Sequence, residues 1–435
     1  MTPDERERKV RELMADHHAA GGYISSEEAE HIIDEAEAKG AAAKAPPAKG
    51  KREFLPFSSP LISEDEITEV ADTLRSGWLT TGPKVKRFEE EFARYVESKH
   101  AVAVNSCTGA LHLALVAAGI GQGDEVITTP FTFIATANVI LHVGAKPIFV
   151  DVRPDTFNID VEKLEAVITP KTKAIMPVHY AGQPCEMDEI LGIAEKHNLL
   201  VIEDAAHAVA AEYKGKKIGT IGDATCFSFY ATKNLVTGEG GMVTTDDGRV
   251  AEKIRILSLH GMSRDAWKRY TAAGSWYYEV IYPGYKYNMT DIQASLGLHQ
   301  LRKLPRFQKR REEIAKDYNE AFAALDTIKT PFLKPDIKHA WHLYVVKVVP
   351  EKLKIDRAQF IEALGREGIG TSVHFIPVHL HPYYRETFGF KRGDFPVAEE
   401  AYERVVSLPL YPKMSDGDVK RVIESVKKVV GKYRK

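Results

Sequence analysis

A lysine that lies between two short motifs is the first candidate for chemistry in this sequence. The run Ser228-Phe-Tyr-Ala-Thr-Lys233 ends a stretch of β-forming residues, and glycines follow at Gly238, Gly240 and Gly241. A desolvated lysine loses its charge readily, and its neutral amine can form a Schiff base with an aldehyde cofactor such as pyridoxal phosphate. A lysine after a strand is more often a solvated charge, so other residues must decide between the two interpretations.

Three further strand ends carry residues that such a cofactor needs. Thr108 and Gly109 lie where an apolar strand turns into a helix, whose free N–H groups can bind a phosphate or serve only as a capped helix start. Asp204 ends the strand at 199–203 and can pair with a protonated ring nitrogen, or can cap the next segment. Phe133 can stack on a planar ring or pack in the core. Their occurrence at successive strand ends favours the cofactor interpretation.

Alternating strands and helices must position these motifs. The strands are short, apolar on both faces and separated by helices, which predicts a mostly parallel sheet covered on two sides, with ligands beyond the carboxyl ends of the strands. We expect strands at 101–105, 125–129, 147–152, 174–180, 199–203, 225–229 and 241–245, and helices between them that include 161–167.

Three parts of the chain differ in composition. Residues 1–52 predict a helical hairpin followed by a small, basic, proline-containing linker. Residues 53–305 form the expected large domain, and residues 306–435 form a smaller α+β domain. The basic helix near 415–433 has an apolar face that we expect to pack in the core of this smaller domain.

Bulk composition excludes several classes of protein. The 435 residues contain 59 Lys+Arg and 61 Asp+Glu, so the net charge of −2 gives no reason to expect a nucleic-acid or membrane partner. The N-terminus lacks the apolar core of a signal peptide, and no apolar run reaches about 18 residues. Cys107, Cys185 and Cys226 are far apart and odd in number, which is typical of reduced thiols in a cytoplasmic protein.

Five histidines in the last hundred residues raise the question of a metal site. They are His339, His342, His374, His379 and His381. No paired cysteine or glutamate motif accompanies them, so we expect no metal and interpret most of them as structural histidines.

Longer runs resemble the DegT/DnrJ/EryC1/StrS family of pyridoxal-phosphate sugar aminotransferases. The resemblance covers about 54–435 and rests on AVNSCTGALHLAL, VIEDAAHAV, FSFYATKNLVTGEGGMV, GYKYNMTDIQASLGLHQL and GIGTSVHFIPVHLHPYY. It implies the type I fold of pyridoxal-phosphate transferases, with a seven-stranded, mostly parallel sheet in the large domain.

The resemblance also implies roles around the cofactor ring. Lys233 would form the internal aldimine and move the protons of the reaction. Asp204 would pair with the ring nitrogen, His207 would lie by the ring hydroxyl, and Phe133 would stack on the ring.

Further roles concern the phosphate and the substrate. Thr108, Gly109 and Ser228 would hold the phosphate together with Asn288 from a neighbouring subunit, which makes a homodimer the active unit. The positions implied for substrate binding are Thr80, Thr81 and His374.

The activity implied is transfer of an amino group from L-glutamate to a keto carbon, C4, of a nucleotide-linked sugar. The likeness is greatest to the UDP-4-amino-4-deoxy-L-arabinose synthase group, which implies a UDP-4-keto sugar and a role in polysaccharide or lipopolysaccharide biosynthesis. Cys107 and Tyr230 depart from residues common in such relatives. Two alternatives stay open: a dehydratase branch, which carries histidine in place of the lysine, and a non-catalytic relative, which would have a degraded site.

Overall fold

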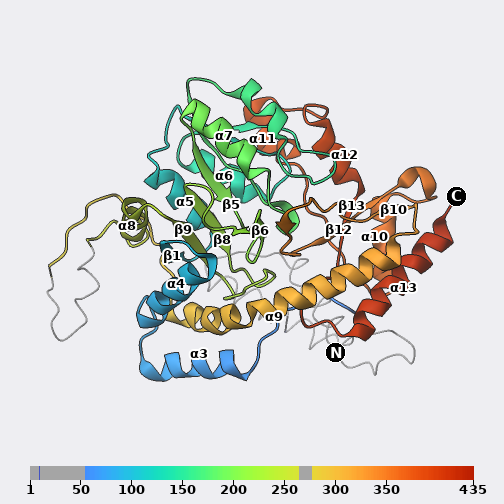
Figure 1. The fold of residues 1–435 in the computed structure, drawn as a ribbon, viewed down its shortest axis with the longest axis horizontal. Helices are drawn as coiled ribbons and strands as arrows, with labels where there is room; N and C mark the ends of the chain where they lie inside the picture. Colours follow the sequence, from blue (N-terminus) through green and yellow to red (C-terminus); the bar gives the residue numbers. More distant parts are fainter. Residues whose placement is uncertain (1–8, 10–53, 264–276) are drawn as a thin grey trace. The chain divides into compact units, whose positions relative to one another are not determined.

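The computed structural model describes residue 9, residues 54–263 and residues 277–435. The expected hairpin and linker at 1–52 lie outside the described residues, apart from residue 9. Residues 54–435 form one compact unit, shown as a ribbon in Figure 1.

A seven-stranded sheet is the centre of this unit. Six strands are parallel to one another, and β9 runs antiparallel to both of its neighbours. The predicted mostly parallel sheet is confirmed. Its spatial order is β1 (His100–Val104), β9 (Gly241–Thr245), β8 (Ala224–Ser228), β5 (Leu200–Asp204), β4 (Thr172–Ile175), β2 (Glu125–Thr128) and β3 (Lys146–Phe149).

Helices cover both faces of the sheet because successive apolar side chains point to opposite sides. In β1, Ala101 and Ala103 belong to the core under one helical layer, and Val102 and Val104 belong to the core under the other. The first layer contains α4 (Pro83–Val96), α7 (Met187–His197) and the start of α9 (Asp291–Phe322), and the second contains α5 (Cys107–Ala117), α6 (Ile134–His142) and α8 (Gly248–Leu257). Helix α3 (Glu64–Ser76) packs on α9.

The helix predicted at 161–167 is wrong. Two 3₁₀ turns, Val161–Lys163 and Glu165–Val167, occupy this segment. The chain is extended again at Ile168, and Thr169 precedes Pro170, a position where helical backbone is disfavoured. The extended backbone at Ile168 therefore ends the helical turns at Val167.

The last hundred residues form a second core around a small antiparallel sheet. This sheet has the order β10 (Ile328–Lys329), β12 (Tyr344–Val348), β13 (Val405–Leu408). The segment also contains α10 (Arg357–Arg366), α11 (Pro382–Phe388), α12 (Pro396–Arg404) and α13 (Asp416–Tyr433). A third sheet joins β11 (Ile337–Lys338) to β6 (Glu212–Tyr213) and β7 (Lys216–Lys217).

Helices α9, α10 and α13 contribute to this second core. Helix α9 continues through Pro305, so it crosses the expected domain boundary, and in Figure 1 it extends from the main sheet to the small one. Helix α13 buries Val419, Val422 and Val426, which agrees with the predicted core-facing side.

Candidate active site

Lys233 lies in the turn after β8, at the carboxyl end of the sheet strands. The hydrogen bond from its backbone N–H to the carbonyl of Tyr230 (2.9 Å) closes this turn. Burial lowers the pKa of the Lys233 amine to about 8, against the smaller raising effects of Cys107 and Asp204. A neutral, nucleophilic amine is therefore accessible near neutral pH.

Asp204 ends β5, and its side chain is buried. Burial raises its pKa, while the hydroxyl of Thr136 and the backbone N–H of Ala206 oppose that rise by donating hydrogen bonds of 2.7 and 3.1 Å. Lys233 is the first cation among the further groups that lower this pKa. The structure thus holds a carboxylate that a second positive charge, such as a protonated ring nitrogen, would stabilise.

His207 lies one turn beyond Asp204 and is buried. Burial, followed by the charge of Lys233, lowers the pKa of His207 well below its usual value, so the ring is neutral. Its Nδ1 accepts a hydrogen bond from the N–H of Ala181 (3.3 Å), which leaves Nε2 as the protonated nitrogen. The ring stacks against Phe375 with centroids 5.8 Å apart.

Phe133 and His374 lie near the same stack. Phe133 is 60% exposed, which excludes the core-aromatic alternative, and its ring centroid is 6.1 Å from that of Phe375. His374 contacts the hydroxyl of Ser407 through Nδ1 (2.8 Å), and burial lowers its pKa to about 4, with a further contribution from Lys233.

Strand register brings the Thr108 turn and Ser228 together. Gly241 at the start of β9 pairs with Val104 on one side and with Ser228 on the other. A β-carbon added at Gly241 would lie 2.5 Å from the carbonyl oxygen of Ser106. The turn after β1 therefore packs directly on this glycine, beside the end of β8.

The turn after β1 has free N–H groups of the kind that bind phosphate. Ser106 caps α5 by accepting a hydrogen bond from Gly109 (3.0 Å), whereas the N–H groups of Cys107 and Thr108 donate to no acceptor in the described part of the chain. The N–H of Gly109 is not free, because it donates to Ser106. The absence of a side chain at Gly109 provides space, since a β-carbon there would lie 2.9 Å from Oδ1 of Asn105.

Thr80, Thr81 and Asn288 form a neighbouring group. The side-chain amide of Asn288 donates to the Thr81 hydroxyl (2.7 Å), and Thr81 donates to the carbonyl of Met289 (2.5 Å). The carbonyl of Thr80 accepts from the N–H of Asp291 (3.0 Å). The backbone of Asn288 also forms an isolated antiparallel β-bridge with the backbone of Val104. Among the described residues no hydrogen bond joins Thr80 or Thr81 to Lys233.

Sequence reasoning missed Thr136, Ser106, His342 and Phe375. Ser106 could have been identified as a helix cap, because a serine directly before a predicted helix commonly has this role. Thr136, His342 and Phe375 reach the site from other segments, and a local motif carries no signal for such contacts.

The histidines weighed as metal ligands form separate contacts. Nδ1 of His339 accepts from the N–H of Trp341 (2.8 Å), His342 contacts Asn234 (3.1 Å) and His379 contacts Glu399 (2.9 Å). Within residues 54–263 and 277–435 no group of three or more candidate ligands is arranged to hold a metal. No helix in these ranges has both the length and the apolar character needed to cross a bilayer.

A family model matches this chain. The model of the DegT/DnrJ/EryC1/StrS aminotransferase family matches residues 60–427, a range that contains every residue of the candidate site.

Similar proteins extend over nearly the same range. The uncharacterized protein MJ1066 of Methanocaldococcus jannaschii is 64% identical over 384 residues, which are 88% of this chain and all of that protein. The spore coat polysaccharide biosynthesis protein SpsC of Bacillus subtilis is 61% identical over 381 residues, 87% of this chain and 98% of SpsC. Structures of the putative sugar aminotransferase Spr1654 from Streptococcus pneumoniae are 40% identical and cover 87% of this chain and 99% of that protein, with TM-scores of 0.82 for the PMP form and 0.81 for the PLP form.

Proposed function

This chain belongs to the DegT/DnrJ/EryC1/StrS aminotransferase family, and we propose that it transfers an amino group from L-glutamate to the C4 keto carbon of a nucleotide-linked sugar, most closely a UDP-4-keto sugar. The observation that carries the proposal is that burial lowers the pKa of Lys233 to about 8, which makes its neutral amine accessible, and that this amine interacts electrostatically with the buried carboxylate of Asp204.

The family is dependent on pyridoxal 5′-phosphate, and the residues present fit this cofactor. Asp204 is a buried carboxylate without full charge compensation, which suits a protonated ring nitrogen. Cys107 and Thr108 have backbone N–H groups without an acceptor in the described ranges, at the start of α5, where the helix dipole favours a phosphate. Because Gly241 has no side chain, this turn can pack directly against its backbone.

When bound, the cofactor supplies an electron sink that acidifies the bond next to the transferred nitrogen. We assign to Lys233 both the attachment of the cofactor aldehyde and the movement of a proton to and from the substrate carbon. Asp204 would keep the ring nitrogen protonated. The N–H at Nε2 of His207 would donate toward the ring hydroxyl, and Phe133 would cover one face of the ring.

We further assign Thr108, Gly109, Ser228 and Asn288 to the phosphate. Among the described residues the Ser228 hydroxyl accepts only a long bond, from the N–H of Tyr230 (3.4 Å), so its own proton is available to a phosphate oxygen.

The sugar-nucleotide side of the site would be formed by Thr80, Thr81 and His374. His374 is neutral because burial lowers its pKa to about 4, so it would bind sugar hydroxyls by hydrogen bonds rather than by charge. The polysaccharide role named for SpsC supports a product that enters a cell-surface polysaccharide or lipopolysaccharide. The three cysteines are free and buried, which supports a cytoplasmic location.

A homodimer whose site includes Asn288 of the neighbouring chain is part of the proposal. Mixed dimers of Lys233→Ala and Asn288→Ala chains test it. If Asn288 acts across the interface, each mixed dimer has one intact site and regains activity that neither parent has. If Asn288 acts within its own chain, mixing restores nothing.

Two separate assays test the activity. L-Glutamate alone should convert the bound cofactor to its amino form and release 2-oxoglutarate, which tests the donor. A panel of UDP-, dTDP- and GDP-linked keto sugars should then regenerate the aldehyde form with the accepted sugar. Lys233→Ala is the control and should do neither. Donor turnover without any accepted sugar would contradict the nucleotide-sugar assignment and leave the aminotransferase assignment intact.

A further inference from the structure

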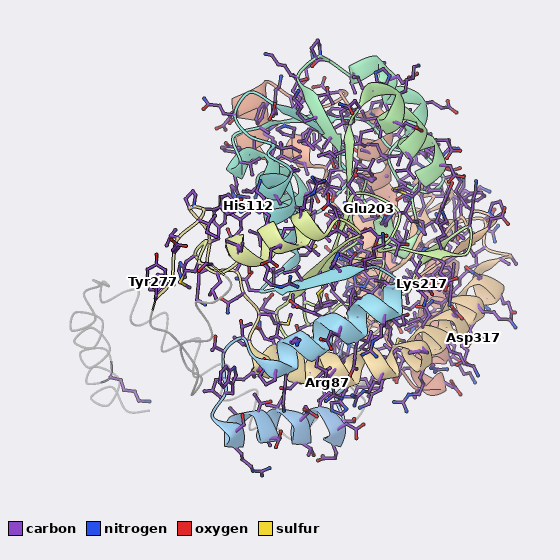
Figure 2. All side chains as sticks on the ribbon, turned by 60° about the vertical axis from the view of Figure 1, so that its left-hand side comes forward. Arg87, His112, Glu203, Lys217, Tyr277 and Asp317 are labelled. Atoms are coloured by element: carbon purple, nitrogen blue, oxygen red, sulfur yellow. The ribbon has the colours of Figure 1, made fainter. Side chains whose placement is uncertain are left out.

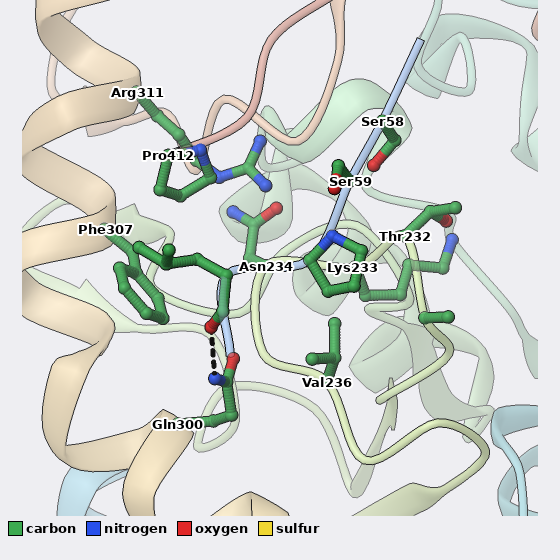
Figure 3. Close-up of a pocket in the computed structure, with 13 residues that line it drawn as sticks. Ser58, Ser59, Thr232, Lys233, Asn234, Val236, Gln300, Phe307, Arg311 and Pro412 are labelled. Carbon is green, nitrogen blue, oxygen red and sulfur yellow. Dashed lines mark hydrogen bonds between the residues drawn. The ribbon is translucent and has the colours of Figure 1, made fainter. Parts of the chain in front are cut away.

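A narrow cavity lies between the Lys233 turn and helix α9, and Lys233 is itself one of its lining residues. Figure 3 shows Arg311 reaching from α9 toward Asn234, with Ser58, Ser59 and Gln300 also lining this space. The cavity has room for about one water-sized particle.

Arg311 is a buried cation with no ion-pair partner among the described residues. Its side chain is 2% exposed, and burial alone lowers its pKa to about 9. The carboxylate of Glu66, which contacts Gln300, is already paired with Lys303 (2.8 Å). An uncompensated buried charge is costly, so a counter-charge at this place would be strongly favoured.

One edge of the Arg311 guanidinium has no hydrogen-bond partner among the residues that the structure describes. Nη1 donates to the carbonyls of Trp341 (3.0 Å), His342 (3.4 Å) and Leu410 (2.8 Å). Nε is buried without a partner, and Nη2 donates to no acceptor in the described part of the chain. Nε and Nη2 form the edge through which an arginine can bind an anion by two parallel hydrogen bonds.

Other donors around the cavity are free as well. The hydroxyls of Ser58 and Ser59 form no hydrogen bond with any described residue, and the buried backbone N–H of Asn234 has no acceptor within the described ranges. The lining therefore combines Arg311 and Lys233 with free donors and contains no carboxylate.

We propose that this cavity binds one small monovalent anion of halide size, chloride under ordinary conditions, on the Nε–Nη2 edge of Arg311. The anion offsets the buried guanidinium and ties α9 to the Lys233 turn and to the 58–59 segment. The inference stands apart from the proposed amino transfer, because its readout is anion binding.

Bromide tests the site directly. Crystals of the full chain with its cofactor, soaked in bromide, should give an anomalous diffraction peak in the cavity within hydrogen-bonding distance of Nε and Nη2. A water in the cavity without anomalous signal would overturn the proposal. This measurement needs no variant, so it does not depend on how Arg311 substitutions fold.

Solution stability supplies the second measurement. At constant ionic strength, replacement of gluconate by chloride at ten times its dissociation constant should lower the unfolding equilibrium constant about 11-fold. Arg311→Met should lose this response, and Arg310→Gln, which removes a charge one position earlier on α9, should keep it. An equal chloride response in all three proteins would show that the effect lies elsewhere and would refute the site.

Discussion

The hydroxyl of Thr136 donates a 2.7 Å hydrogen bond to Oδ2 of Asp204, and both side chains are buried. Because hydrogen bonds to charged groups are worth about 1.5–3 kcal/mol, this contact helps to keep the carboxylate ionised against the effect of burial. Thr136→Val should raise the pKa of Asp204 further and weaken pyridoxal phosphate binding by roughly tenfold or more.

Titration of the protein with the cofactor, followed by absorbance, measures this loss. Thr136→Ser keeps the donor and should bind normally. Thr132→Val is a matched control, since Thr132 contacts the Thr136 hydroxyl (2.8 Å) but not Asp204. Equal weakening in the two valine variants would argue against the role given to the Thr136–Asp204 bond.

The burial-lowered pKa of Lys233 predicts a specific pH dependence. The neutral amine is the reactive form, so the rate at which cofactor-free protein takes up pyridoxal phosphate should rise about tenfold per pH unit below pH 8 and level off above it. The charge of Asp204 raises this pKa, so Asp204→Asn should move the inflection to lower pH. An inflection near pH 10.5 in the unmodified protein would contradict the burial argument.

The same shift affects stability with a defined sign. Between about pH 8 and pH 10.5 the unfolded chain binds a proton at Lys233 that the folded chain does not bind. The contribution of this group to the free energy of unfolding therefore rises with pH across that window. Comparison of urea unfolding of cofactor-free protein with that of Lys233→Met isolates the contribution, which should be absent from the variant.

Alanine substitution at Gly241 and at Gly192 should change the free energy of unfolding in opposite directions. At Gly241 the new β-carbon would lie 2.5 Å from the Ser106 backbone, so we expect a loss of about 1–3 kcal/mol and weaker cofactor binding as the turn shifts. At Gly192, inside α7, nothing lies within 4 Å of the added carbon, so alanine should stabilise the helix by about 0.5–1 kcal/mol. Chemical unfolding and cofactor titration of both variants check this contrast.

A buried pair next to Asp204 should be important for stability. Glu203, labelled in Figure 2, is fully buried and accepts hydrogen bonds from Thr225 (2.6 Å), Gly222 (2.9 Å) and Nε2 of His179 (2.8 Å). Nδ1 of His179 accepts from the N–H of Cys185 (3.1 Å), so Nε2 must carry the proton.

Glu203→Gln would replace one of the two acceptor oxygens by an amide NH₂ group that faces a hydrogen-bond donor, and we expect a loss of about 1–3 kcal/mol. The exposed Glu195→Gln should change stability by less than about 0.5 kcal/mol. Urea unfolding of the two variants tests the pair, and similar curves would contradict it.

Much of the fold was predictable because both faces of the sheet strands are apolar. That pattern located β1, β5, β8 and β9 and therefore the strand ends that carry Asp204 and Ser228. It failed at 161–167, where helix-like spacing was too short to overcome the extended backbone that precedes Pro170.

The candidate site was predictable only where its residues lie in local motifs. The partners of those residues were not, because they come from distant segments. His342 lies 4.4 Å from His207 between ring centroids, and Phe375 stacks on the same ring from a separate loop. The unpaired edge of Arg311 could not be predicted from the sequence either, since it depends on which backbone carbonyls accept hydrogen bonds from Nη1 in the folded chain.

The pairing of β9 with β1 links residues about 140 positions apart, as in His100 with Thr245. The loop-closure entropy of so long a segment must be overcome before the Ser106 turn can lie against Gly241. During synthesis, a chain that has not yet emerged as far as residue 245 therefore lacks the proposed phosphate pocket, and cofactor binding would show that β1 and β9 have paired.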